Sequence, residues 1–175
     1  MSMPPQTPPP ATAHEPAPHY PWRHAVTTRW ADNDIYGHVN NAVYYQYFDS
    51  AINALLIEKA GLDIQHGTVV GFIVRSECDY LKPVAYPGTL EVGVAVERLG
   101  GRSVTYRVAL FSAQGEPCAR GRMVHVFVDT AHGRSVAVPE TTRQALLPYL
   151  LPSSAADAQA KAAACNAGAA SAGTV

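Results

Sequence analysis

The sequence predicts an α+β domain in which an antiparallel sheet is wrapped around one long helix. Two observations point to this class. Residues 42–60 carry apolar side chains at helical spacing, and the later segments alternate apolar and polar residues as strands do. A helix and a sheet each have one apolar face to cover, and wrapping the sheet around the helix covers both.

The two ends of the 175-residue chain differ from its middle in composition. Residues 1–20 are rich in proline and alanine, and residues 151–175 are mostly alanine, glycine and serine. Neither segment has an apolar pattern that a core could bury, so we expect both to be disordered tails. The folded domain is expected over residues 21–150, which is long enough for one hydrophobic core.

Composition argues against several classes of partner. The net charge of -1, with 15% charged residues and no basic stripe, argues against nucleic acid. We find no secretory signal and no apolar stretch long enough to span a bilayer, so no membrane partner is expected. Cys78, Cys118 and Cys165 lack CxxC spacing and the seven histidines form no HExxH, so we expect no metal, no cofactor and a cytoplasmic location.

The first strand is expected over residues 22–31, with Val26 and Thr28 on one face. The helix over residues 42–60 follows, and Gly61 should end it because glycine readily adopts the left-handed conformation found after helices. Its apolar stripe consists of Tyr44, Phe48, Ala51 and Leu55, widened by Tyr47, Ile52 and Leu56.

Four more strands are expected to follow the helix as a meander. Their predicted ranges are residues 69–81, 90–97, 104–110 and 123–128. Gly100-Gly101 and residues 114–116 predict hairpin turns, and Pro87-Gly88 breaks the chain between the second and third strands. A short helix should then run from near Pro139 to about Leu147. The last strand is apolar on both faces, which suggests that a second copy of the chain covers the outer surface.

The segment RWADNDIYGHVNN, residues 29–41, joins the first strand to the helix. Asp32 and Asp34 flank one asparagine, Gly37 follows, and Asn40-Asn41 stands where the helix should start. Asparagine is a strong N-cap residue, and a helix N-terminus offers unpaired N–H donors and a partial positive charge. A carboxylate beside such donors is suited to attack on a carbonyl group.

Each of these residues also has a structural interpretation. Both aspartates could hydrogen-bond the local backbone; we favour that role for Asp32 and catalysis for Asp34. His38 could contact a substrate, but holding the loop is the simpler role, and Asn40 is expected to cap the helix or anchor the loop. Tyr44 is expected in the core or at an interface, and His125 is expected to be a packed histidine.

The pattern R-W-x-D-x-D-x-x-G-H-V-N-N-x-x-Y over residues 29–44 resembles the opening motif of hotdog-fold acyl-CoA thioesterases of the 4-hydroxybenzoyl-CoA thioesterase-like family. YLKPV at residues 80–84, FVD at 127–129 and AVPE at 137–140 are similar to later segments of that family. The resemblance covers about residues 22–148. It implies a hotdog fold, a five-stranded antiparallel sheet wrapped around one long central helix. Pro87-Gly88 stands where many members have Gly-Asp, which leaves that loop open.

The resemblance also implies an activity, the hydrolysis of acyl-CoA or related pantetheine thioesters by a homodimer or homotetramer. It makes Asp34 the nucleophile or general base and the backbone N–H near Asn41 the oxyanion donor. Gly37, His38, Asn40 and Tyr44 then become substrate-binding or loop-positioning residues. The chemistry is reasonable, because a thiol with a pKa of about 8.5 leaves without much help from an acid.

Two alternatives stay open at this point. A hotdog-fold hydroxyacyl-thioester dehydratase would need a histidine and an acidic residue facing each other, and His38 is available. A non-catalytic hotdog protein would bind an acyl thioester or only assemble. Such a protein would lose nothing on neutralisation of Asp34.

Overall fold

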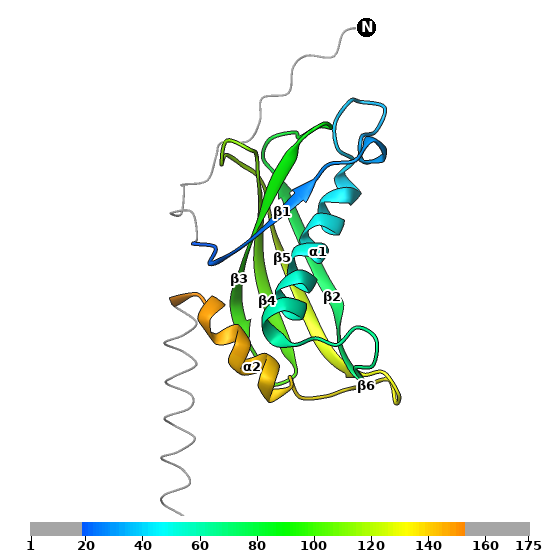
Figure 1. Ribbon diagram of the computed structural model, residues 1–175, viewed down its shortest axis with the longest axis vertical. Coiled ribbons are helices and arrows are strands. Elements are labelled where there is room, and N and C mark those ends of the chain that lie inside the picture. Colours follow the sequence, from blue (N-terminus) through cyan, green and yellow to red (C-terminus); the bar gives the residue numbers. More distant parts are fainter. Residues whose placement is uncertain (1–18, 153–175) are drawn as a thin grey trace, which may run out of the picture.

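The computed structural model describes residues 19–152, so nearly all of the two predicted tails lies outside the described residues. Figure 1 shows an antiparallel sheet with a helix lying along one of its faces. The elements in chain order are β1 (Trp22–Thr27), a 3-10 turn (Trp30–Asp32), α1 (Asn41–Ala60), β2 (Val69–Tyr80), β3 (Thr89–Leu99), β4 (Ser103–Phe111), β5 (Pro117–Asp129), β6 (Arg134–Ser135), α2 (Glu140–Leu146) and a second 3-10 turn (Leu147–Tyr149).

The sheet has six strands, where five were predicted, because the two-residue β6 pairs with β5. The other strands lie in the order β1-β3-β4-β5-β2, and all of their pairs are antiparallel. The predicted meander is therefore wrong for β2, which pairs with β5 and not with β3. Short hairpins force β3, β4 and β5 to be neighbours, whereas the proline-containing segment 81–88 forms no hairpin and lets β2 cross to the far edge.

The first strand is shorter than predicted. It ends at Thr27, and the chain then turns at Trp30–Asp32, where the N–H of Asp32 donates to the carbonyl of Arg29 at 3.0 Å. Val26 and Thr28 are both buried, as expected for one face. The motif that begins at Arg29 thus lies in a turn and a loop rather than at the end of a strand.

Helix α1 packs its apolar stripe against the inner face of the sheet, and every predicted residue of that stripe is buried. The helix begins as expected, because the Asn40 side chain accepts from the N–H of Ala42 at 3.0 Å. It ends at Gly61, whose φ of 65° is left-handed. The short helix α2 also contacts α1, and its Leu146 belongs to the core between α1 and the sheet.

The outer face of the sheet is partly charged. Glu97 there accepts from Arg107 at 3.1 Å and from Arg122 at 3.0 Å. Tyr20, at the end of the predicted N-terminal tail, is buried with Ala95 and Ala109. Among residues 19–152, no helix is both long enough and apolar enough to cross a membrane.

Candidate active site

The Asp34 loop, defined here as residues 33–39, is a tight turn between β1 and α1. The N–H of Asp34 donates to the carbonyl of His38 at 2.9 Å, and the N–H of Gly37 donates to the carbonyl of Asp34 at 3.1 Å. Gly37 has a φ of 81°, a conformation that glycine adopts without strain. Asn33 and Val39 pair at the base of the loop. These bonds explain why a glycine stands three residues after the aspartate.

The carboxylate of Asp34 is half-exposed. Its Oδ1 accepts from the N–H of Tyr36 at 2.9 Å, which is a local aspartate turn. Its Oδ2 has no hydrogen-bond partner among the described residues. One oxygen is therefore held by the loop and the other is open to an incoming group.

The start of α1 offers a free donor next to this loop. Asn40 caps the N–H of Ala42, and its own N–H donates to the carbonyl of Asp32 at 2.8 Å. Asn41 is the first helical residue and is exposed. Its N–H donates to no group within residues 19–152, as expected for the first turn of a helix. This N–H can bind an oxygen that carries negative charge.

A cavity of about 280 Å³ opens beside the helix start. Its lining residues from the Asp34 loop and α1 are His38, Val39, Asn41 and Tyr44, and those from the end of β2 are Tyr80, Leu81, Lys82 and Pro83. Three predicted site residues thus meet at one cavity. Asp34, Gly37 and Asn40 do not line it: the first two shape the loop and the third caps the helix.

The contribution of β2 was not foreseen. In the sequence, the YLKPV segment was noted only for its similarity to the family. No feature of those residues predicts that their side chains reach the start of α1. In the structure the Tyr80 hydroxyl donates to the carbonyl of Asn41 at 3.0 Å, and the Tyr80 and Tyr44 rings pack edge to face at 5.0 Å. Burial raises the pKa of Tyr44, and mainly burial raises that of Tyr80 to about 12, so both phenols are neutral donors near pH 7.

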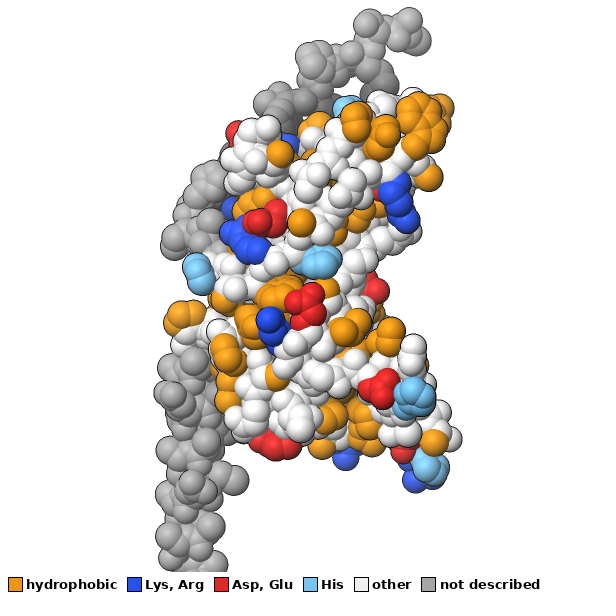
Figure 2. Space-filling model, viewed as in Figure 1, with side chains coloured by type: hydrophobic (Ala, Val, Ile, Leu, Met, Phe, Trp, Pro, Cys, Tyr) orange, Lys and Arg blue, Asp and Glu red, His pale blue; other side chains and the backbone are white. Residues whose placement is uncertain are grey.

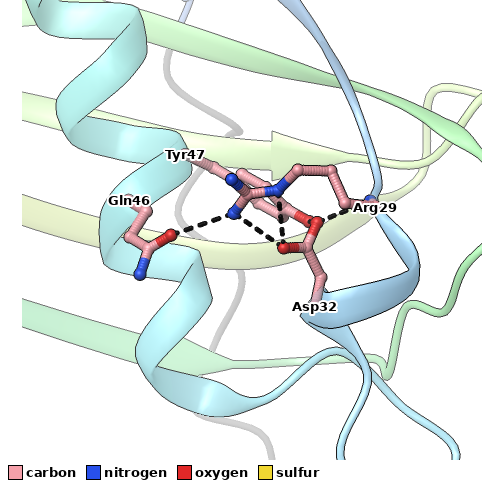
Figure 3. Close-up of polar contacts among 4 residues, drawn as sticks. All are labelled: Arg29, Asp32, Gln46 and Tyr47. Carbon is pink, nitrogen blue, oxygen red and sulfur yellow. Dashed lines mark hydrogen bonds and ion pairs between the residues drawn. The ribbon is translucent and has the colours of Figure 1, made fainter.

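Asp32, two residues before Asp34, is only 1% exposed. Its Oδ2 accepts from the N–H of Arg29 and from the hydroxyl of Tyr47, each at 2.6 Å, and its Oδ1 accepts from Arg29 Nε at 2.9 Å (Figure 3). Burial acts to raise the pKa of this carboxyl, but the hydrogen bonds from Arg29 and Tyr47 outweigh it and hold the pKa below its ordinary value. Asp32 is therefore an anion in a closed network.

Hydrophobic side chains gather at the end of the molecule where the Asp34 loop lies (Figure 2). Trp30, Ile35 and Tyr36 are 82%, 92% and 81% exposed. Trp30 packs edge to face on Tyr86, with ring centroids 5.9 Å apart. In the described part of the chain, no three His, Cys, Asp or Glu side chains lie close enough together to hold a metal ion.

An antiparallel sheet with α1 on its inner face, and a carboxylate loop leading into the start of that helix, define a hotdog-type protein. The model of the thioesterase-like superfamily matches residues 28–146. The chain therefore belongs to the hotdog-fold thioesterase-like superfamily.

Solved structures agree with this assignment. The PA5185 protein of Pseudomonas aeruginosa is 51% identical, covers 76% of this chain and 94% of its own, and superposes with a TM-score of 0.73. PA2801 of the same organism, a candidate thioesterase, is 33% identical over 71% of this chain and 96% of its own, with a TM-score of 0.67. SAV2348 of Staphylococcus aureus, solved in complex with CoA, shares the fold at 16% identity over 73% of this chain and 82% of its own, with a TM-score of 0.66.

Proposed function

We propose that this protein hydrolyses acyl-CoA or a related pantetheine thioester, with Asp34 as nucleophile or general base and the N–H of Asn41 as oxyanion donor. One observation carries the proposal. In a chain of the thioesterase-like superfamily, the loop that bears Asp34, with only Oδ1 of its carboxylate bonded, leads directly into the start of α1. There the N–H of Asn41, which has no acceptor among residues 19–152, lies beside a cavity. A carboxylate and an oxyanion donor are the two groups that hydrolysis of a thioester requires.

Each group has a defined task in this reaction. The carboxylate of Asp34 either attacks the thioester carbonyl carbon, giving a mixed anhydride that water then hydrolyses, or takes a proton from the attacking water. The N–H of Asn41 binds the developing oxyanion, an interaction commonly worth about 3 kcal/mol. The thiolate leaves without a strong acid, because thiols have a pKa of about 8.5. The acyl group or pantetheine arm would lie along the aromatic wall of Tyr44 and Tyr80.

The remaining predicted residues support this geometry. Gly37 allows the turn that places Asp34 before the helix, and Asn40 caps the N–H of Ala42, which leaves the N–H of Asn41 available to a substrate oxygen. His38 and Tyr44 line the cavity and would contact the substrate. Lys82 lines the same cavity, where it pairs with Glu116 at 3.0 Å, and could face a phosphate of CoA.

We propose a homodimer as the working unit and α1 as its central helix in each copy. The support is β2, which lies at one edge of the sheet formed by residues 19–152 and has exposed apolar side chains, including Phe72 and Val74. Such an edge is a template for pairing with another chain. CoA is the carrier we propose first, because SAV2348 shows that a protein of this fold can hold it. A cytoplasmic location and membership of the 4-hydroxybenzoyl-CoA thioesterase-like branch are part of the same proposal.

The test is thiol release from a panel of short-chain, long-chain and aromatic acyl-CoAs by the purified protein and by Asp34→Asn. Asp63→Asn is the matched control, because Asp63 Oδ1 also accepts from the N–H two residues on, Gln65, at 2.9 Å but lies after the other end of α1. We expect Asp34→Asn to lower the rate at least about a hundredfold and Asp63→Asn to leave it unchanged. An unaffected Asp34→Asn would move the catalytic role elsewhere, and no release from any substrate would favour a binding-only protein.

A further inference from the structure

We infer that Asp32 is a positioning residue: its buried carboxylate ties the Asp34 loop to helix α1 and so sets the distance between the attacking group and the oxyanion donor. The inference rests on the proposed hydrolysis and deepens it. It assigns a role to three residues, Arg29, Asp32 and Tyr47, that take no direct part in the reaction described above.

The contacts of Asp32 join three separate parts of the chain. Arg29, before the 3-10 turn, donates to it through its backbone N–H and through its guanidinium. Tyr47, in the second turn of α1, donates its hydroxyl at 2.6 Å (Figure 3). The backbone carbonyl of Asp32 accepts from the N–H of Asn40, the cap of α1, at 2.8 Å. One residue therefore connects the entry to the loop, its exit and the body of the helix.

The position of Tyr47 makes this connection stiff. A hydroxyl that projects from the second turn of a helix moves with the whole helix rather than with its frayed end. The Arg29 guanidinium adds a second tie to α1, since its Nη2 donates to Gln46 Oε1 at 3.1 Å. The loop itself has few other anchors, chiefly Val39 N–H to the carbonyl of Val84 at 2.8 Å and Tyr86 N–H to Asn33 Oδ1 at 3.0 Å.

Asp32 cannot perform the chemistry itself. Its side chain is 1% exposed, both of its carboxylate oxygens accept from Arg29 or Tyr47, and it does not line the cavity. Its effect must pass through Asp34 and Asn40. A misplacement of about 1 Å at a reacting group can cost about a hundredfold in rate, so an anchor of this kind is expected to act on kcat rather than on substrate binding.

The decisive variant is Tyr47→Phe, which deletes one hydroxyl and keeps the ring. Tyr106→Phe is the matched control, because Tyr106 is a buried tyrosine whose hydroxyl has no hydrogen-bond partner in the described part of the chain. Asp32→Asn, which keeps the shape and removes the charge, is the second variant. Measurements are kcat and KM on the best substrate of the panel, well below the melting temperature, and hydrogen exchange at the N–H groups of Asp34 and Asn40.

We expect Tyr47→Phe to lower kcat about tenfold, with KM changed less than about twofold, and to speed exchange at the loop. Asp32→Asn should lower kcat further and speed exchange further, and Tyr106→Phe should change neither kcat nor exchange. Faster exchange with an unchanged kcat would overturn the inference and leave Asp32 as a structural residue only. An unchanged kcat in Tyr47→Phe and in folded Asp32→Asn, with Asp34→Asn inactive, would overturn this inference alone. A wild type that hydrolyses no thioester would overturn the proposed function, and the inference with it.

Discussion

The rings of Tyr106 and His125 meet edge to face with centroids 5.1 Å apart, and neither side chain has a hydrogen-bond partner among residues 19–152. Tyr106 is 0% exposed and His125 is 2% exposed. They lie on the neighbouring strands β4 and β5 and face the helix side of the sheet. Buried polar groups without partners cost free energy of folding, so this pair is a weak point in the core.

Replacing Tyr106 by phenylalanine should stabilise the protein. The change keeps the ring packing and removes a buried hydroxyl that bonds to none of the described residues, so we expect a gain of about 1 kcal/mol in the free energy of unfolding. Denaturant titration measures the gain. Tyr47→Phe, which deletes a hydrogen-bonded hydroxyl, should lower the free energy of unfolding by a similar amount. Destabilisation by Tyr106→Phe would show that its hydroxyl has a partner in solution, such as a buried water.

His125 should make stability depend on pH. Burial lowers the pKa of His125 to about 4, against 6.5 for the ordinary group. Between these values the unfolded chain binds the extra proton and the folded protein does not, so folding loses stability as the pH falls. The contribution of neutral His125 to the free energy of unfolding is fully present above about pH 6.5. By about pH 4 the protein has lost about 3 kcal/mol of stability through this residue.

The measurement is the free energy of unfolding of wild type and His125→Met at pH 7.5, 5.5 and 4.5. Carboxylates contribute equally to the pH dependence of both proteins. The difference between the two free energies of unfolding therefore reports the contribution of His125. We expect the free energy of unfolding of His125→Met to rise steadily relative to that of the wild type as the pH falls. Parallel curves would mean that His125 is protonated as easily in the folded protein as in the unfolded chain.

Gly61 should be hard to replace. Its φ of 65° is left-handed, and its N–H closes α1 by donating to the carbonyl of Leu56. Alanine there should cost about 1 kcal/mol in the free energy of unfolding, because a Cβ is strained in this conformation. Gly101→Ala is the control, since Gly101 has no positive φ and open space around it, and it should change stability by less than about 0.5 kcal/mol. Equal effects would contradict the assigned cap.

The two ion-pair sites of the outer face should differ in strength. Burial acts to raise the pKa of Glu97, but Arg122 and Arg107 outweigh it and hold the pKa below its ordinary value. Glu97→Gln should therefore cost about 1 kcal/mol at pH 7, whereas Glu91→Gln, which breaks one exposed pair with Arg23, should cost close to nothing. Thermal unfolding at low and high salt compares the stability lost in the two variants. An equal loss at both sites would contradict the stronger pairing assigned to Glu97.

Much of the fold follows from local patterns in the sequence. The stripe from Tyr44 to Leu56 predicts the buried face of α1, and Asn40 and Gly61 predict its ends. The prediction was wrong about β2, whose pairing with β5 joins residues that lie far apart in the chain, from Tyr80 with Ala119 to Val69 with Asp129. It also extended β1 too far, because the turn at Trp30–Asp32 is held in part by the hydroxyl of Tyr47, which meets Asp32 only after folding.

By itself the sequence determined the fold class, the helix and its caps, and the hairpins. It also determined the segment from Asp34 to Tyr44, which contains the residues proposed for catalysis. These features depend on periodicity and on the conformational preferences of single residues, which act over a few positions of the chain. Only the tertiary structure decided which strand lies beside the helix start, which residues of β2 line the cavity and which hydroxyl holds Asp32. Those relationships depend on the packing of distant segments, because a hydrogen bond between residues such as Asp32 and Tyr47 exists only once the helix and the loop are docked.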